Sequence, residues 1–141
     1  MCPDGNGIIS SGEINSSQIS SLSLAFMGDA VWELLIRQYI LSKGDKKVAD
    51  LHKASIGFAN ADFQAEAGEK LTAFMTEEEL SVYRRAKNSH SAHTPKNKTA
   101  FQYHKATAFE ALIGKLYLDG NYKRIFEFFD IIINSTAGDN K

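Results

Sequence analysis

Apolar residues recur every three or four positions along most of the chain, which is the spacing of one face of an α-helix. The longest such segment covers residues 19–41, where Leu22, Phe26 and Ala30 form one apolar row and a second row lies beside it. Because this segment is apolar on more than one face, we expect it to be a central helix of the fold. Gly44 follows it as a helix terminator.

The rest of the chain shows the same periodicity, separated by turn residues. We predict helices from 46 or 47 through 54, over 59–74, over 76–87, over 99–118 and over 122–134. Thr76 and the three glutamates after it, Glu77 to Glu79, have the pattern of a helix start with a capping box. Since no alternating strand pattern of useful length is present, the predicted fold class is all-α, without an internal repeat.

The two ends of the chain lack this periodicity. Residues 1–18 are rich in Gly, Ser and Asn, so we expect a flexible N-terminal tail, one folded domain over 19–136, and a short C-terminal tail over 137–141. The tail segment DGNGIISSGE resembles part of a calcium-binding loop. Its first ligand position would be Cys2, which is not an oxygen ligand, so we interpret the match as coincidence.

Composition excludes several classes of protein. The 141 residues are 43% hydrophobic and 23% charged, the balance of a globular domain. No apolar run approaches the roughly 18 residues of a membrane span, and the first residues do not resemble a secretory signal. With one cysteine, Cys2, the chain fits a reducing compartment, and we expect a cytoplasmic protein that does not bind a membrane.

Charge is segregated along the chain although the net charge is only −1. Residues 80–109 contain no acid and carry six basic side chains: Arg84, Arg85, Lys87, Lys96, Lys98 and Lys105. Such a block is a candidate surface for a polyanion, and a solvated face that happens to lack acids is the alternative.

Two carboxylates stand in unusual surroundings. Asp29 and Glu110 both lie within predicted helices, flanked by small and apolar residues. Small residues let two helices approach closely, and two carboxylates brought together would repel unless one is protonated or a divalent cation lies between them. One hypothesis is therefore a Mg²⁺ site that activates water against a phosphodiester. The alternative is that each carboxylate caps a helix end or pairs with a lysine such as Lys105.

Histidines and aromatic residues add weaker candidates in the basic segment. His90, His93 and His104 do not have the three or four rigid ligands of a zinc site, and we interpret them as surface residues beside a phosphate-contacting loop. Three aromatic residues could stack on bases, but their helical spacing favours the core: Tyr83, Phe101 and Tyr103.

The segments FMGDAVWELLIR and ATAFEALIGKLYLD together resemble the two signature segments of the ribonuclease III family, over residues 19–136. The chain is too short for the double-stranded-RNA-binding domain of longer members, so it resembles the Mini-III branch. The segment RAKNSHSAHTPKN is similar to the basic loop of that branch.

The resemblance implies roles for particular residues. Asp29 matches the catalytic aspartate and Glu110 the metal-binding glutamate, with Mg²⁺ as the cofactor. Leu22, Ala25 and Thr107 occupy places where longer family members have acids, which leaves the metal count open. Glu33 lies one turn after Asp29 on the same face, so a supporting role behind the metal ligands is one alternative, and a place at the surface or in a dimer contact is the favoured one. The expected RNA-binding residues are Arg84, Arg85, Lys87, Asn88, Lys96, Asn97, Lys98 and Lys105.

The resemblance also implies an activity and its partners. We expect a Mg²⁺-dependent endoribonuclease that cuts double-stranded RNA and matures the ends of 23S ribosomal RNA precursors, with help from a ribosomal protein bound to the substrate. A homodimer is expected, and Phe26, Met27 and Trp32 are the candidate interface. Two alternatives stay open: a non-catalytic double-stranded-RNA-binding member of the same fold, and a helical module that binds proteins.

Overall fold

The computed structural model describes residues 14–89 and 98–139, and every element in these two ranges is a helix. Their order is η1 (Ser16–Gln18), α1 (Ser21–Ser42), α2 (Val48–Ala59), α3 (Ala61–Leu71), η2 (Thr72–Phe74), α4 (Glu77–Lys87), α5 (Lys98–Leu118) and α6 (Tyr122–Asp139), where η marks a 3-10 helix. The predicted all-α class is confirmed, and each predicted helix is present.

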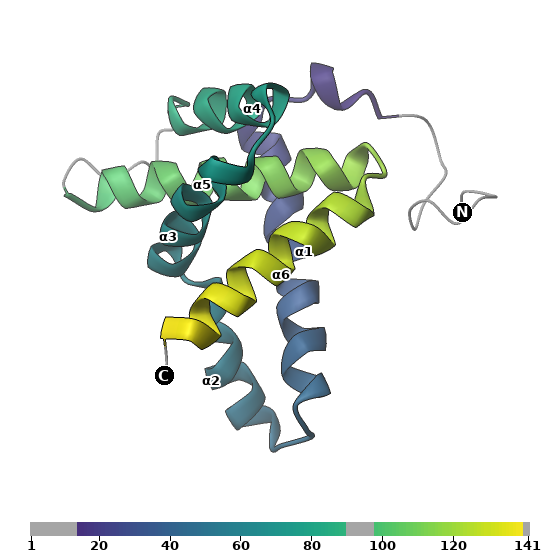
Figure 1. Ribbon diagram of the computed structural model, residues 1–141, viewed down its shortest axis with the longest axis vertical. Helices are drawn as coiled ribbons and strands as arrows, with labels where there is room; N and C mark the ends of the chain where they lie inside the picture. Colours follow the sequence, from purple (N-terminus) through teal and green to yellow (C-terminus); the bar gives the residue numbers. More distant parts are fainter. Residues whose placement is uncertain (1–13, 90–97, 140–141) are drawn as a thin grey trace.

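Helix α5 is the centre of the arrangement. In Figure 1 it runs across the molecule, with α1 crossing behind it, α4 above it and α6 passing diagonally in front, while α2 returns beside the far half of α1. Among the described helices, the α1–α5 contact is the most extensive and the α3–α5 contact is second. None of these helices combines the length and the apolar run that crossing a lipid bilayer takes.

Local capping explains where several helices begin. The Thr76 N–H donates to Glu79 Oε1 at 2.8 Å and the Glu79 N–H donates to Thr76 Oγ1 at 3.1 Å, so the predicted capping box is confirmed. Asn60 separates α2 from α3 because its Oδ1 accepts the N–H of Phe63 at 2.8 Å.

Two helix ends differ from the prediction. The expected helix over 59–74 stops at Leu71 and tightens into η2, where Thr72 Oγ1 donates to the Glu69 carbonyl at 2.6 Å. The last helix reaches Asp139 instead of residue 134, since no proline interrupts the segment and Thr136 Oγ1 donates back to the Ile132 carbonyl at 2.9 Å.

The described chain begins inside the segment expected to be a tail. Residues 1–13, which include the calcium-loop match, lie outside the described residues, and the domain boundaries stay a prediction. Residues 16–18 nevertheless form η1, and Ser16 is buried. Lys115 Nζ donates to Ser16 Oγ at 2.9 Å and pairs with Asp119 at 2.8 Å, and Ser16 Oγ also donates to Asp119. These contacts attach η1 to the end of α5.

Trp32 is a core residue, which corrects its proposed place in a dimer interface. Its side chain is only 1% exposed, and Nε1 donates to the Phe58 carbonyl at 2.8 Å. The indole ring lies edge-on to Phe109, with the ring centroids 5.0 Å apart. An amphipathic aromatic side chain buried with its N–H satisfied has no free surface to offer a partner.

The close approach of α1 and α5 depends on two glycines. A Cβ atom added to Gly28 of α1 would lie 1.7 Å from the Glu110 carbonyl oxygen, and one added to Gly114 of α5 would lie 2.0 Å from the Leu24 carbonyl oxygen. Only residues without a Cβ allow the two backbones to cross at this separation. The crossing fixes where Asp29 and Glu110 lie.

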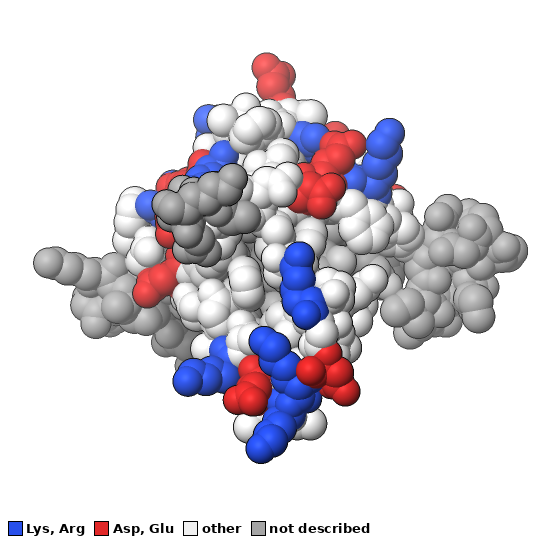
Figure 2. Space-filling view, turned by 60° about the horizontal axis from the view of Figure 1, so that its bottom comes forward, with Lys and Arg blue, Asp and Glu red and all other residues white. Residues whose placement is uncertain are grey.

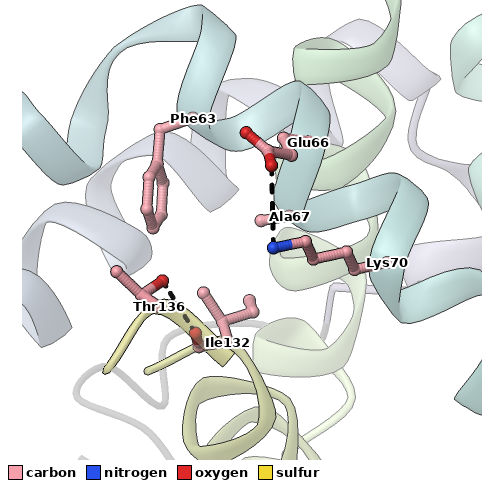
Figure 3. Close-up of a pocket in the computed structure, with 6 residues that line it drawn as sticks. All are labelled: Phe63, Glu66, Ala67, Lys70, Ile132 and Thr136. Atoms are coloured by element: carbon pink, nitrogen blue, oxygen red, sulfur yellow. Dashed lines mark hydrogen bonds and ion pairs between the residues drawn. The ribbon is translucent and has the colours of Figure 1, made fainter. Parts of the chain in front are cut away.

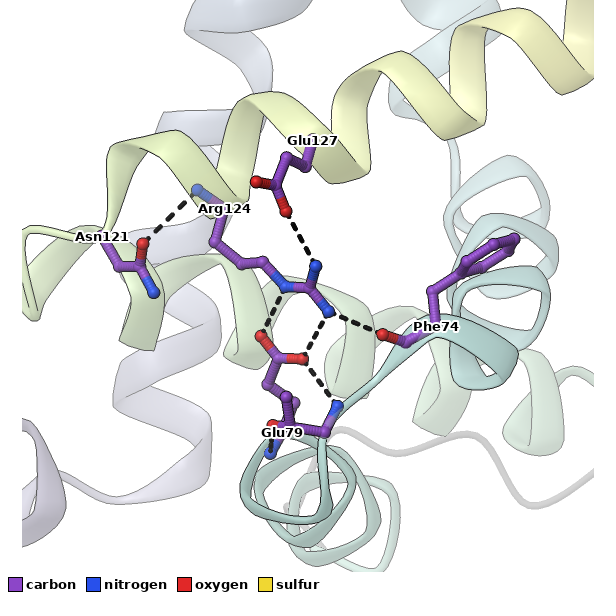
Figure 4. A network of polar contacts seen from close by, with 6 residues as sticks. Phe74, Glu79, Asn121, Arg124 and Glu127 are labelled. Atoms are coloured by element: carbon purple, nitrogen blue, oxygen red, sulfur yellow. Dashed lines mark hydrogen bonds and ion pairs between the residues drawn. The ribbon is translucent and has the colours of Figure 1, made fainter.

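Arg124 links α6 to the first turn of α4, as Figure 4 shows. Its guanidinium donates to both Glu79 carboxylate oxygens at 2.9 and 3.0 Å, to Glu127 at 2.8 Å and to the Phe74 carbonyl at 2.6 Å. Burial alone would raise the pKa of Glu79, but the hydrogen bonds from Arg124 and Thr76 outweigh burial and hold that pKa below its usual value.

Candidate active site at the crossing of α1 and α5

The two carboxylates singled out from the sequence meet in space. Asp29 follows Gly28 on α1, and Glu110 is the α5 residue whose carbonyl lies against Gly28. Their side chains lie close enough together for Asp29 to raise the pKa of Glu110, and Asp29 is exposed while Glu110 is half-buried. Neither residue is at a helix end, so neither is a cap.

The environment of Glu110 favours its protonated form. Burial, followed by the hydrogen bond with Asp29 and the negative charge of Asp29, raises the pKa of Glu110 to about 9. In the metal-free protein, the protonated form of Glu110 is therefore favoured near neutral pH. Lys105 does not pair with either carboxylate, because its Nζ lies 3.1 Å from Glu69 Oε1 and is engaged there.

Gln64 of α3 is the third polar side chain at this site, and the sequence analysis missed it. It is only 3% exposed and lies against the Glu110 carboxyl group, where its effect is to lower the pKa of Glu110. Its Nε2 has no hydrogen bond of good geometry to any described residue. A glutamine in an otherwise ordinary amphipathic helix carries no local signal of such a role.

The pair is suited to a divalent cation. Two carboxylates this close repel when both are ionised, and a divalent cation between them removes that repulsion. Within residues 14–89 and 98–139, no group of three or more His, Cys, Asp or Glu side chains could hold a metal. Asp29 and Glu110 would thus supply two ligands, and water or phosphate oxygens the others, as Mg²⁺ commonly allows.

The positions where longer family members carry acids contribute no ligand. Thr107 is buried, and its Oγ1 donates to the Tyr103 carbonyl at 2.9 Å. Ala25 is buried between helices and Leu22 lies partly exposed at the start of α1. Glu33 forms an ion pair with Arg37 at 3.5 Å on the surface of α1.

The expected RNA-binding residues divide into two groups. Arg84, Arg85 and Asn88 are exposed at the C-terminal end of α4. Lys87 and Lys105 are instead drawn together by Glu69 of α3, at 3.2 and 3.1 Å from its Oε1. For Lys98 only the backbone at the start of α5 is described, and Lys96, Asn97, His90 and His93 lie outside the described residues.

Glu69 is a second residue that sequence reasoning missed. Besides the two lysines, it accepts a hydrogen bond from the Tyr83 hydroxyl at 2.9 Å. Burial works to raise the pKa of Glu69, yet the bonds from Lys105, Tyr83 and Lys87 together lower it. Part of the basic block in the sequence is therefore neutralised by an acid from another helix.

The aromatic residues of this region do not all belong to the core. Tyr83 is buried as predicted, but Phe101 is 59% exposed, which corrects its predicted burial. Lys105 Nζ lies 4.1 Å and Lys87 Nζ 5.6 Å from the centre of the Phe101 ring. The ring is held at the surface by contacts with cations rather than by packing.

Cavities lie elsewhere in the molecule. One of about 150 Å³ lies between α3 and α6, where Glu66 and Lys70 form an ion pair at 3.6 Å (Figure 3). Two others lie beside Leu41 of α1 and beside Arg124 of α6. None of these three cavities is lined by Asp29 or Glu110.

Surface charge is mixed on the face drawn in Figure 2, where acidic and basic side chains alternate around a broad area of other residues. That face carries no field of a single sign. Binding of a polyanion would depend on particular exposed cations, such as Arg84 and Arg85, more than on the overall charge.

Comparison with known proteins agrees with this geometry. Residues 22–121 match the family described as the ribonuclease III domain. The Mini-ribonuclease 3 of Clostridium tetani is 41% identical over 118 residues, which are 83% of this chain and 78% of that protein. The Mini-ribonuclease 3 of Brevibacillus brevis is 43% identical over 106 residues, 75% of this chain and 79% of that protein. A crystal structure of a Fusobacterium nucleatum protein matches with a TM-score of 0.76 and 36% identity, covering 84% of this chain and 95% of the other. The chain belongs to the ribonuclease III family and is an endoribonuclease of that family.

Proposed function

We propose that this endoribonuclease cleaves double-stranded RNA by metal-assisted hydrolysis, with Asp29 and Glu110 holding Mg²⁺. The observation that carries the proposal is the contact between these two carboxylates where α1 and α5 cross. When bound, the cation supplies an activated water and neutralises charge on the phosphate. Asp29 is exposed and can meet a phosphate-bound cation from the solvent side, while Glu110 is held behind it.

The RNA would be held mainly by side chains at the end of α4. Arg84, Arg85 and Asn88 are exposed and can reach phosphate oxygens. Lys87 and Lys105 also belong to the proposed set, but Glu69 offsets their charge, so each contributes less to phosphate affinity. Lys96, Asn97 and Lys98 are proposed on the sequence alone. Affinity due to these residues should fall as salt rises.

The biological substrate and partners are proposed from the family resemblance. We infer that the substrate is a 23S ribosomal RNA precursor, with a ribosomal protein as an accessory partner, in the cytoplasm. A homodimer is proposed because each protomer offers one site and a duplex has two strands to cut. A stripe along α1 supports this: Leu22, Phe26 and Leu34 are apolar, four to eight residues apart, and 36%, 82% and 58% exposed.

The test is cleavage of a labelled RNA duplex in Mg²⁺ by the parent protein and by Asp29→Asn. We expect the parent to cut and the variant to lose more than about 100-fold in rate, because a lost ligand should cost more than the 10–100-fold of a supporting residue. Asp130→Asn is the matched control, since Asp130 is an exposed acid on α6. Equal cleavage by Asp29→Asn and the control would contradict the proposal.

A non-catalytic double-stranded-RNA-binding protein is the second candidate, favoured by Ala25 and Thr107 where other members have acids. It predicts salt-sensitive duplex binding without cleavage in any divalent cation. The cleavage assay separates the two functions, provided that duplex binding is measured on the same samples. A protein-interaction module would show no salt-sensitive duplex affinity.

A further inference from the structure

We propose that Gln64 is a positioning residue for Glu110, donating from Nε2 to the Glu110 carboxylate and so fixing the orientation in which that carboxylate holds a divalent cation. The inference rests on the proposed function, because it takes Asp29 and Glu110 as the ligands. It concerns a residue on α3, a helix that carries neither of them.

The packing of α3 on α5 places Gln64 at the site. One turn after Gln64, a Cβ added to Gly68 would lie 3.2 Å from Phe109 Cβ, so the two helices are in close contact beside Glu110. Gln64 lies on the same side of α3, is 3% exposed, and meets the Glu110 carboxyl group. Its position is fixed by backbone packing and not by a flexible surface conformation.

The amide of Gln64 has an unused donor. Nε2 is buried, and none of the described residues accepts a hydrogen bond from it in good geometry. A buried donor without an acceptor destabilises the fold, and an apolar side chain of the same length would not carry that cost. A cation held between Asp29 and Glu110 would keep the Glu110 carboxyl ionised, and an ionised carboxylate beside Gln64 would offer Nε2 the acceptor that it lacks.

Two other polar side chains on the preceding turns of α5, Thr107 and Lys105, are already engaged. Thr107 Oγ1 donates to the Tyr103 carbonyl at 2.9 Å, and Lys105 pairs with Glu69 at 3.1 Å. Ligating carboxylates are generally oriented by a hydrogen bond to their other oxygen, and loss of that bond weakens metal affinity about 10–100-fold. Gln64 is placed to supply this bond.

The experiment measures Mn²⁺ affinity by electron paramagnetic resonance or calorimetry, together with the Tm of the metal-free protein. We expect Gln64→Met to weaken Mn²⁺ binding about 10–100-fold while the Tm in EDTA stays the same or rises. Gln64→Asn keeps the amide but shortens its reach, so it should weaken binding to a similar degree. Gln102→Met, at a half-buried glutamine two turns before Glu110, is the control and should bind as the parent does.

The decisive quantity is metal affinity. Mn²⁺ binding by Gln64→Met within about twofold of the parent would overturn the inference, because a purely structural glutamine changes Tm and leaves affinity alone. If the methionine variant does not fold, unchanged affinity in Gln64→Asn overturns it instead. Asp29→Asn must abolish the same binding; retained binding in that variant would contradict the metal site itself, which is a different failure.

Discussion

At the scale of single residues, Glu110 lowers the stability of the metal-free fold near neutral pH, and the same carboxyl group is a proposed metal ligand. A carboxyl group with a pKa of about 9 in the folded protein would ionise near 4.5 in the unfolded chain. The unfolded state therefore loses its proton first as pH rises, and this group's contribution to stability declines between those two values. The metal-free fold carries this cost at neutral pH, and a bound cation would remove it.

The pH dependence gives a prediction for Glu110→Gln. The amide cannot ionise, so the variant should unfold at higher temperature than the parent in EDTA at pH 7.5, by a free-energy gain of order 1–3 kcal/mol. The gain should shrink as pH falls toward 4.5, where the parent's unfolded state is also protonated. Thermal unfolding of parent and variant between pH 4.5 and 7.5 measures the gain and its decrease with pH. A variant less stable than the parent at pH 7.5 would contradict the raised pKa of Glu110.

Glu69 shows, also at the residue scale, why the charge of a sequence segment does not give the charge of the surface that the segment forms. The segment over 80–109 has no acid of its own, which made it a candidate surface for a polyanion. Glu69 comes from α3 and engages Lys87 and Lys105, so two of the six cations are paired. The identity of a charged partner is set by which helices are neighbours, and nothing near these lysines in sequence records it.

At the scale of elements, the α1–α5 crossing organises the fold and the site together. Helix starts are read well from the sequence because caps act within a few residues, as at Thr76 and Asn60. The approach of two helices is encoded more weakly, by small residues such as Gly28 and Gly114. Those residues suggested close packing, while the tertiary structure determined which helix each one meets.

A matched pair of glycine substitutions tests this crossing. Gly28→Ala should destabilise the protein by at least about 3 kcal/mol, because the added methyl would meet a backbone carbonyl that cannot rotate away. Gly57→Ala is the control: it lies inside α2 with no atom within 4 Å of its added Cβ, and alanine there should stabilise the helix by about 0.5–1 kcal/mol. Chemical unfolding measures the change in the free energy of unfolding, which should be a decrease for Gly28→Ala and an increase for Gly57→Ala.

At the scale of the whole molecule, α1 has two different faces. One face, with Trp32 and Ile36, is buried in the core, and the other exposes Leu22, Phe26 and Leu34. Apolar residues around the whole of α1 predicted that it would be a central helix. That part of its apolar surface binds a second copy of the chain stays a prediction. The correction at Trp32 matters because only the exposed stripe is available for a dimer.

The dimer prediction is tested by Phe26→Glu. Burying a carboxylate in a symmetric apolar contact costs enough to weaken association by more than about 100-fold, so the variant should sediment as a 15.6 kDa species where the parent is a dimer. Phe126→Glu, at a 54% exposed position on α6, is the control and should leave the parent's oligomeric state unchanged. A parent that sediments at 15.6 kDa would contradict the homodimer.

The sequence by itself determined the helices, the all-α class and two carboxylates in anomalous surroundings, because periodicity, caps and small flanking residues are local properties of the chain. Only the tertiary structure decided that Asp29 and Glu110 lie close together and that Gln64 lies beside Glu110. It also decided that Glu69 pairs with two of the basic side chains, and that Phe101 is exposed while Trp32 is buried. Each of these depends on which helix packs beside which, and contacts between distant segments leave almost no trace in local sequence.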